Sequence, residues 1–361
     1  MLDLKIFAAL ATRAHHASSG IAKRGEPGSD QTSGAVAYIV IALNVALFLP
    51  VFVYLTYTLS GIFPILAIVE SKPGYERIPS KGDDDLKGDK KVQSDSIEEP
   101  DTDDPKPITS SIHAIHNLLC SIGGFRSLFR SFPWLFILAA VNVILAVTLY
   151  WIPFLPRRFD GLLAEIITLQ LQVTWVHLVV TAPSDKWAWK RIPGFKQTIR
   201  AVALPVVITS VTVFLAELLP ALAMMAMKVV MMRPYNAFDY PEQNTPLWKF
   251  LIFLFMRLAV TALLNIPAQA IMVRCAVSIL PEDGETIVPV DRTFGIESAR
   301  EKGYLSVIDA FRSMKGAWGR LYKLWFKVFL LTVAIQILVG AVMFLELLGL
   351  ALYSSRHQSH D

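Results

Sequence analysis

The sequence has few cysteines and little that could bind a metal. Only Cys120 and Cys275 occur among its 361 residues, and they show neither metal-ligand spacing nor the pattern of a disulfide framework. We interpret both as small apolar residues. His113 and His116 have the spacing of a metal pair, but no cysteine or acid stands at a partner spacing. We therefore predict no metal site and no cofactor.

Signatures of enzymes and of nucleic-acid-binding proteins are also missing. The chain has no G-x-S-x-G, no H-E-x-x-H, no phosphate loop and no dinucleotide fingerprint. We therefore expect no enzyme activity, and a membrane enzyme of an unrecognised class stays an open alternative. The net charge is only +4, and no basic stripe with interleaved aromatics lies outside the loops. This argues against nucleic acid as a partner.

Long hydrophobic runs are what the chain has in excess. It is 54% hydrophobic, whereas ordinary soluble domains are about 45–50% apolar. The excess is gathered in blocks near the length of about 20 residues that a membrane helix needs. We predict an all-α, multi-pass membrane bundle of about six transmembrane helices, with three pseudo-repeats of two as one arrangement. The six spans are Val36–Val69, Phe132–Phe154, Leu162–Thr181, Ala201–Met227, Leu247–Val277 and Trp325–Tyr353.

Polar and amphipathic segments separate these spans. Residues 70–107 are rich in charge and poor in large apolar side chains, a composition typical of disorder. Residues 108–131 and 304–324 carry apolar residues at helical spacing, and we predict amphipathic helices on the membrane surface. We expect residues 1–34 and 354–361 to be tails, and residues 35–69 to hold the first transmembrane helix.

Basic residues predict the orientation. The connection after the third span contains Lys186, Lys190, Arg191, Lys196 and Arg200, against one acid. The connections after the first and fifth spans are also rich in Lys and Arg. By the positive-inside rule these three connections share one face of the membrane, and an even number of spans then puts both termini on the other face.

Two motifs read as divergent copies of one another. Residues 123–130 (GGFRSLFR) and 316–323 (GAWGRLYK) share the pattern Gly, small, aromatic, two variable positions, Leu, aromatic, basic. Each precedes an even-numbered span, and each odd-numbered span has a proline near its basic end, at Pro64, Pro183 and Pro267. Aromatic and basic clusters are also ordinary interfacial anchors, so the paired occurrence is what favours duplication.

This arrangement resembles the mitochondrial carrier family. That family has three repeats of two membrane helices, with a P-x-[DE]-x-x-[KR] signature ending each odd helix. A surface helix and a glycine-aromatic-basic motif follow the signature. Residues 267–325 carry the best part of the resemblance, from PAQAIMVR to AFRSMKGAWGRLYKLW. The resemblance implies a fold of six helices in three repeats.

The charges of the family's gate are mostly replaced here. In the family, the acid and the basic residue of the signatures form a ring of ion pairs that closes the transport path. With one charge left at the six positions, we expect that this ring of ion pairs cannot form here. The acidic positions hold Leu66, Asp185 and Gln269, and the basic positions hold Val69, Ala188 and Met272.

Polar residues inside the spans are the candidates for contact with a solute. An ionisable group at membrane depth costs about 2.5–3.5 kcal/mol on insertion scales, so it needs a reason to be there. Arg257 and Glu217 could form a buried pair between two spans or bind a charged solute, and Glu346 lies in the last span. A polar stripe on the third span either bonds neighbouring helices or lines a watery path. It consists of Gln170, Thr174 and His177.

A cationic and aromatic cluster follows the third span. Trp187, Trp189, Lys190 and Arg191 have the composition of an interfacial anchor, and such a cluster can also hold acidic lipid headgroups. We expect membrane lipids as partners.

The sequence favours a non-transporting, carrier-like membrane adaptor or organiser. A protein partner would dock on the loop at 70–107. The alternative is a solute transporter with an atypical gate. Arg13, Lys23 and Arg24 in an acid-poor N-terminal region suit a mitochondrial leader, so we prefer a mitochondrial membrane over the endoplasmic reticulum or plasma membrane.

Overall fold

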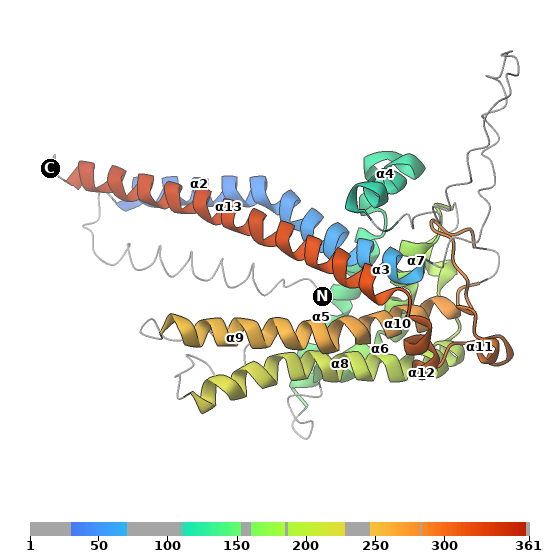
Figure 1. Cartoon of the computed structure of the whole chain (residues 1–361). Coiled ribbons are helices and arrows are strands. Elements are labelled where there is room, and N and C mark those ends of the chain that lie inside the picture. Colours follow the sequence, from blue (N-terminus) through green and yellow to red (C-terminus); the bar gives the residue numbers. More distant parts are fainter. Residues whose placement is uncertain are drawn as a thin grey trace, which may run out of the picture. The chain divides into compact units, whose positions relative to one another are not determined.

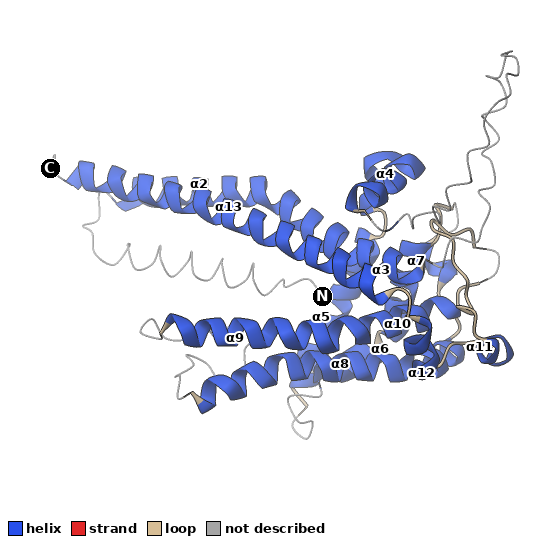
Figure 2. Ribbon diagram, in the orientation of Figure 1, coloured by secondary structure: helices blue, strands red, loops and turns tan. Residues whose placement is uncertain are grey.

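The protein is helical throughout the part of the chain that the structure describes. The computed structural model describes residues 30–70, 109, 111–152, 160–184, 187–227, 246–281 and 284–358. In Figure 2 these residues are drawn as helices and connecting loops. An antiparallel bridge between Thr181 and Thr286 is the one β interaction among them. The predicted all-α class is confirmed.

Within the described residues, five helical stretches are long and apolar enough to cross a membrane, and a sixth results if one bent pair of helices is a single span. This confirms the predicted multi-pass architecture. Many large apolar side chains on these stretches are exposed, including Ile144, Phe255 and Phe344. An apolar surface of this extent suits contact with lipid rather than with water. The stretches are Ala42–Val69, Ile112–Tyr150, Phe195–Ala226, Leu247–Ser278 and Trp318–Glu346.

The chain divides into two compact units. The first unit ends at Pro64 and resumes at Gly319, so it joins the first long helix with the last. The side-chain amide of Asn44 donates a hydrogen bond to Glu346 and ties these two helices together. Figure 1 shows the elements, which are α2 (Asp30–Val53), the π-helical segment η1 (Tyr54–Ile62), the start of α3 (Phe63–Val69) and α13 (Trp318–Gln358).

The second unit, residues 65–318, is built around one long helix. Helix α8 packs against α6, α7, α9 and α10; in Figure 1, α8 and α9 run alongside each other. The helices after α3 are α4 (Ile112–Gly123), α5 (Phe132–Tyr150), α6 (Asp160–Ile167), α7 (Leu169–Val180), α8 (Phe195–Ala226), α9 (Leu247–Val260), α10 (Ile266–Ser278), α11 (Glu297–Lys302) and α12 (Val307–Ser313). Short 3₁₀ turns η3 (Gly124–Phe129) and η4 (Ala188–Arg191) and the π-helical segment η5 (Thr261–Asn265) complete the unit.

Prolines lie inside several long helical stretches without ending them. A proline has no N–H to donate and its ring clashes with the carbonyl four residues earlier. The chain meets this by widening ahead of two prolines, since η1 precedes Pro64 and η5 precedes Pro267. Pro205 lies inside α8, where the carbonyl of Ala201 loses its usual N–H donor, and the Thr209 hydroxyl donates to the Pro205 carbonyl at 2.9 Å.

The structure corrects three predicted boundaries. The predicted single helix at 162–181 is two helices, α6 and α7, bent by 59°. The surface helix predicted at 304–324 is only α12, because the residues from Trp318 onward already belong to α13. The predicted C-terminal tail at 354–361 is helical as far as Gln358. Extending a helix that already exists costs little per residue, so α13 continues into the polar residues that follow Tyr353.

Two other predicted segments fall largely outside the described residues. The loop predicted at 70–107 is described only at Glu70, and the tail predicted at 1–34 only from Asp30, where α2 begins. The surface helix predicted at 108–131 corresponds to α4 and η3.

Candidate functional site: a junction of three helix ends

Three odd-numbered spans end close together in the second unit. The last turn of α3, the end of α7 and the end of α10 are joined by hydrogen bonds described below. The loops that leave α7 and α10 pair at the Thr181–Thr286 bridge. There Ala182 N–H donates to Glu285 O at 2.8 Å and Ile287 N–H donates to Val180 O at 2.9 Å. These contacts define a junction on the side of the basic connections.

Arg274 is the central side chain of the junction. It projects from α10 and is only 3% exposed. Its Nε donates to the carbonyl of Ile68 in α3 at 3.1 Å, and its Nη1 donates to Ser313 Oγ in α12 at 2.5 Å. The ring of Phe294 covers the guanidinium, with 4.5 Å between its centroid and the Arg274 Cζ. One buried cation therefore fixes two helices and a loop against α10.

A tight turn holds Phe294 in place. Phe294 has φ of 50°, a left-handed conformation that a bulky side chain rarely adopts. The Asp291 carboxylate accepts hydrogen bonds from Thr293 N–H at 2.9 Å, Thr293 Oγ1 at 2.7 Å and Gly295 N–H at 2.8 Å. Burial alone would raise the pKa of Asp291, but these bonds and one from Phe294 N–H outweigh it and hold the pKa below its usual value. The ionised carboxylate stabilises the strained turn.

Glu70 brings an acid to the same end of α3. It is 4% exposed, and its Oε2 accepts hydrogen bonds from Thr109 N–H at 3.2 Å and from the Thr109 hydroxyl. The carbonyl that Arg274 binds belongs to Ile68, two residues earlier. The last turn of α3 thus meets both a buried acid and a buried base, and each has the hydrogen bonds that a buried polar group needs.

His177 joins α7 to α10. It is 2% exposed, and its Nε2 donates to Ala276 O at 2.8 Å. The other ring nitrogen, Nδ1, has no hydrogen-bond partner among the described residues. The imidazole is therefore a packing group between two helix ends.

Arg130 and Arg191 close the end of α7. Arg130 belongs to the first glycine-aromatic-basic motif, and its Nη2 donates to the carbonyls of Leu178 and Thr181. Arg191 Nη1 donates to Thr181 Oγ1 at 3.2 Å, and its Nη2 bonds to Ser184. Cations at a helix C-terminus satisfy its free carbonyls and its dipole.

The other residues of the predicted polar stripe also make packing contacts. Gln170 Nε2 donates to Pro193 O at 3.0 Å, and the Thr174 hydroxyl donates to Gln170 O at 2.6 Å within its own helix. Thr174 is fully buried. Of the three residues, only His177 bonds to another helix; Gln170 bonds to the connection before α8, and Thr174 bonds within α7.

The predicted intramembrane charges lie elsewhere. Glu217 is exposed on α8 and Arg257 is partly buried on α9. The two therefore do not make the buried pair that the sequence suggests, because the register of α8 turns Glu217 away from the protein interior. Glu346 receives the amide of Asn44 in the first unit.

The predicted anchor is partly packed. The ring of Trp189 contacts that of Trp134 on α5 edge to face, with centroids 4.7 Å apart. Trp187 and Lys190 are exposed, as an anchor at the lipid headgroups requires. Arg191 instead binds the end of α7.

Several junction residues were not among the predicted site residues. Arg274 lies near the end of a long apolar run. Charged residues inside membrane helices are rare and mark structural or functional sites, so this position alone identifies Arg274 as a candidate. Glu70 carries the same signal at the end of α3. Asp291 and Phe294 gave no such signal, because their role depends on a turn whose partner lies on another helix.

The junction can hold helix ends together, and its chemistry is that of hydrogen bonds and buried charge. Among the described residues, no group of three or more His, Cys, Asp or Glu side chains is arranged to hold a metal ion. No protein-family model, curated protein or solved structure matches the chain.

Proposed function

We propose that this protein is a non-transporting membrane adaptor or organiser, whose helix ends are locked on the side of the basic connections. The observation that carries the proposal is the choice of acceptors at the junction. Arg274, His177 and Arg130 each donate to a main-chain carbonyl of another helix.

Main-chain acceptors favour a fixed lock. A gate made of side-chain ion pairs opens when side chains rotate to new partners. A carbonyl at a helix end moves only with its helix, so parting the junction would leave buried acceptors unsatisfied, at about 1–3 kcal/mol each. Leu66 and Val69, which occupy two gate positions of the carrier pattern, are fully buried and apolar. A scaffold needs helix ends that stay joined, whereas a transporter that works by alternating access needs these helix ends to separate.

The same proposal assigns a protein partner to the loop at 70–107 and a mitochondrial membrane to the whole protein. The polar composition of this loop suits a segment that folds on a partner. The basic, acid-poor N-terminal region supports the choice of membrane. Microscopy of the full-length protein carrying a C-terminal fluorescent protein tests the membrane, and staining of the endoplasmic reticulum would refute it.

Reconstitution tests the absence of transport. Purified protein in liposomes is expected to show no uptake above protein-free vesicles for a panel of radiolabelled anions, cations and amino acids. Saturable uptake of any solute would contradict the proposal.

Proximity labelling tests the adaptor role, comparing the intact chain with a variant whose residues 74–104 are replaced by a Gly/Ser linker of equal length. Neighbours that depend on the natural segment are expected; an identical set would refute docking there.

One observation favours a transporter as the second candidate. The break between α6 and α7 carries a polar network, in which Asn142 Nδ2 donates to Thr168 Oγ1 at 2.8 Å and the Ser210 hydroxyl bonds to Glu165. Ser210 lies about halfway along α8, so Glu165 lies deep in the membrane. Broken helices with a carboxylate at this depth bind the coupling ions or protons of transporters.

The Glu165 network is the place to test this candidate. If the protein transports, Glu165→Gln should abolish uptake in liposomes and the exposed Glu217→Gln should retain it. Equal uptake by the two variants would remove the network from any transport mechanism.

A further inference from the structure

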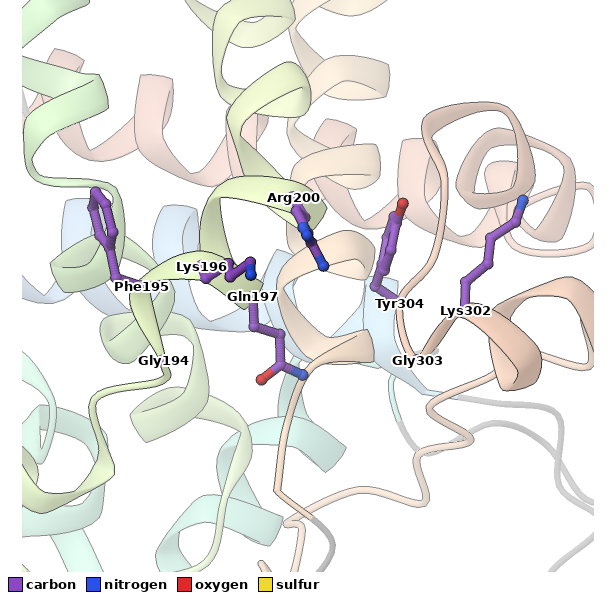
Figure 3. A pocket seen from close by; sticks show the side chains of 8 residues that line it. All are labelled: Gly194, Phe195, Lys196, Gln197, Arg200, Lys302, Gly303 and Tyr304. Atoms are coloured by element: carbon purple, nitrogen blue, oxygen red, sulfur yellow. The ribbon is translucent and has the colours of Figure 1, made fainter.

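A hollow outside the junction gathers positive charge at the start of α8. It has a volume of about 470 Å³ and is lined by residues of two separate segments. Three of the side chains are basic and none is acidic. Figure 3 shows Gln197, Arg200 and Tyr304 between α8 and the turn at Gly303, with Phe195 and Lys302 at opposite ends. The full lining is Gly194, Phe195, Lys196, Gln197, Arg200, Lys302, Gly303 and Tyr304.

Local structure brings these cations together. Lys196 and Arg200 are four residues apart on α8 and so share one face of the helix. Lys302 ends α11, where Gly303 turns the chain with φ of 73° and its N–H bonds to Ala299 O at 3.0 Å. A residue with a Cβ would be strained in this left-handed position, so the glycine sets the direction of Lys302 and Tyr304. Asp309, outside the lining, is the acid that interacts with Lys302.

The neighbouring surface is apolar and exposed. Phe195 is 60% exposed at the edge of the hollow, and Leu204, further along the membrane part of α8, is 61% exposed. A ligand held here thus meets cations and hydroxyl groups at one end and an apolar helix face at the other. A glycerophospholipid has this sequence of groups, whereas inorganic phosphate uses only the first.

We infer that the hollow binds the phosphate headgroup of an acidic phospholipid, with the acyl chains along the exposed face of α8. Lys196, Arg200 and Lys302 contact the phosphate oxygens, and the guanidinium of Arg200 can do so in a bidentate manner. Tyr304 and Gln197 donate hydrogen bonds to the glycerol and phosphate oxygens. The free N–H groups of the first turn of α8 add to the attraction for an anion. The inference is independent of the proposed function, because none of these residues belongs to the junction.

Native mass spectrometry of the full-length protein in detergent tests the site. Wild-type protein is titrated with dioleoyl phosphatidic acid and, separately, with dioleoyl phosphatidylcholine, and we expect tighter binding of the phosphatidic acid. The variant Arg200→Gln/Lys302→Gln should bind phosphatidic acid roughly 30-fold more weakly, at about fivefold for each basic residue near a membrane surface. The control Arg126→Gln/Lys315→Gln removes two exposed cations outside the hollow and should change the affinity less than twofold.

A neutral variant separates the hollow from the general surface charge. Gly194 has φ of −60°, and a Cβ there would meet no atom within 4 Å. A side chain at this position therefore begins in open space, and Gly194→Leu adds bulk at the edge of the hollow while every cation remains. The Gly194→Leu variant should bind phosphatidic acid more weakly than wild type. If the Arg200→Gln/Lys302→Gln variant does not fold, this measurement still shows whether the lipid binds in the hollow.

Four outcomes would overturn the inference, and the first three concern lipid binding itself. These are equal affinity for the two lipids, phosphatidic acid binding by the Arg200→Gln/Lys302→Gln variant within twofold of wild type, and unchanged binding by Gly194→Leu. Displacement of the lipid by inorganic phosphate at equal concentration would assign the hollow to a soluble anion and also refute a lipid site.

Discussion

Single residues decide how the helix ends meet, and Arg274 has the largest share. Its guanidinium donates to α3 and α12 while the ring of Phe294 covers it. Arg274→Met keeps the apolar stem but leaves the buried Ile68 carbonyl without its donor, which costs about 1–3 kcal/mol. We expect a lower melting temperature in a thermal-shift measurement of the detergent-purified protein.

Arg274→Lys is the informative companion of this variant. A lysine keeps the charge, but its single ammonium cannot serve partners that lie in different directions from a planar guanidinium. It should therefore recover little of the lost stability. A lysine variant as stable as wild type would show that charge alone matters at this position.

Asp291 makes the stability of the junction depend on pH. The pKa of its carboxyl is lowered in the folded protein, so its contribution is complete above the ordinary aspartate pKa of about 3.9 and is lost as the pH falls through the lower folded value. Asp291→Asn removes this part of the pH dependence. Between pH 6 and pH 3, the melting temperature of the variant should fall less than that of wild type. Parallel curves would contradict the assignment.

At the scale of elements, the break between α6 and α7 is held by side chains rather than by proline. Thr168 accepts the amide of Asn142 and donates to Ala164 O at 2.8 Å in its own helix. A double-mutant cycle with Asn142→Leu and Thr168→Val should give a coupling energy of about 0.6 kcal/mol, the usual value for such pairs in membranes. Thr148→Val is the control, because that hydroxyl bonds only within its helix, to Ile144 O at 2.7 Å.

Hydropathy predicts the elements of this protein better than their ends or their bends. The spans were found because lipid offers no hydrogen bonds to the backbone, so an apolar run must be helical. The bend at Thr168 was missed because no proline or glycine marks it, and the amide that supports it comes from another helix. Residues such as Phe294 were missed for the same reason, since their contacts are with residues distant in the sequence.

At the scale of the whole molecule, the basic connections predict the side of each segment. Lys190 should lie on one face of the membrane, with Asp30 at the start of α2 and Ser355 near the end of α13 on the other. Single cysteines at these positions, in a background where Cys120 and Cys275 are replaced by serine and alanine, can be labelled with an impermeant maleimide. Labelling of positions 30 and 355 from opposite faces would refute an even number of crossings.

The last helix is longer than the membrane that it crosses. Its 41 residues extend about 60 Å at 1.5 Å per residue, about twice the hydrocarbon thickness of roughly 30 Å. The apolar run continues through residues 347–353 (LLGLALY), so the polar residues 354–358 add only about 8 Å at the carboxyl end. A tilt of 40° would still leave a projection above 45 Å along the membrane normal. The excess length is therefore shared between the two ends of α13, so that Arg320 and Lys323 reach the headgroups on one side and the polar residues 354–358 reach those on the other.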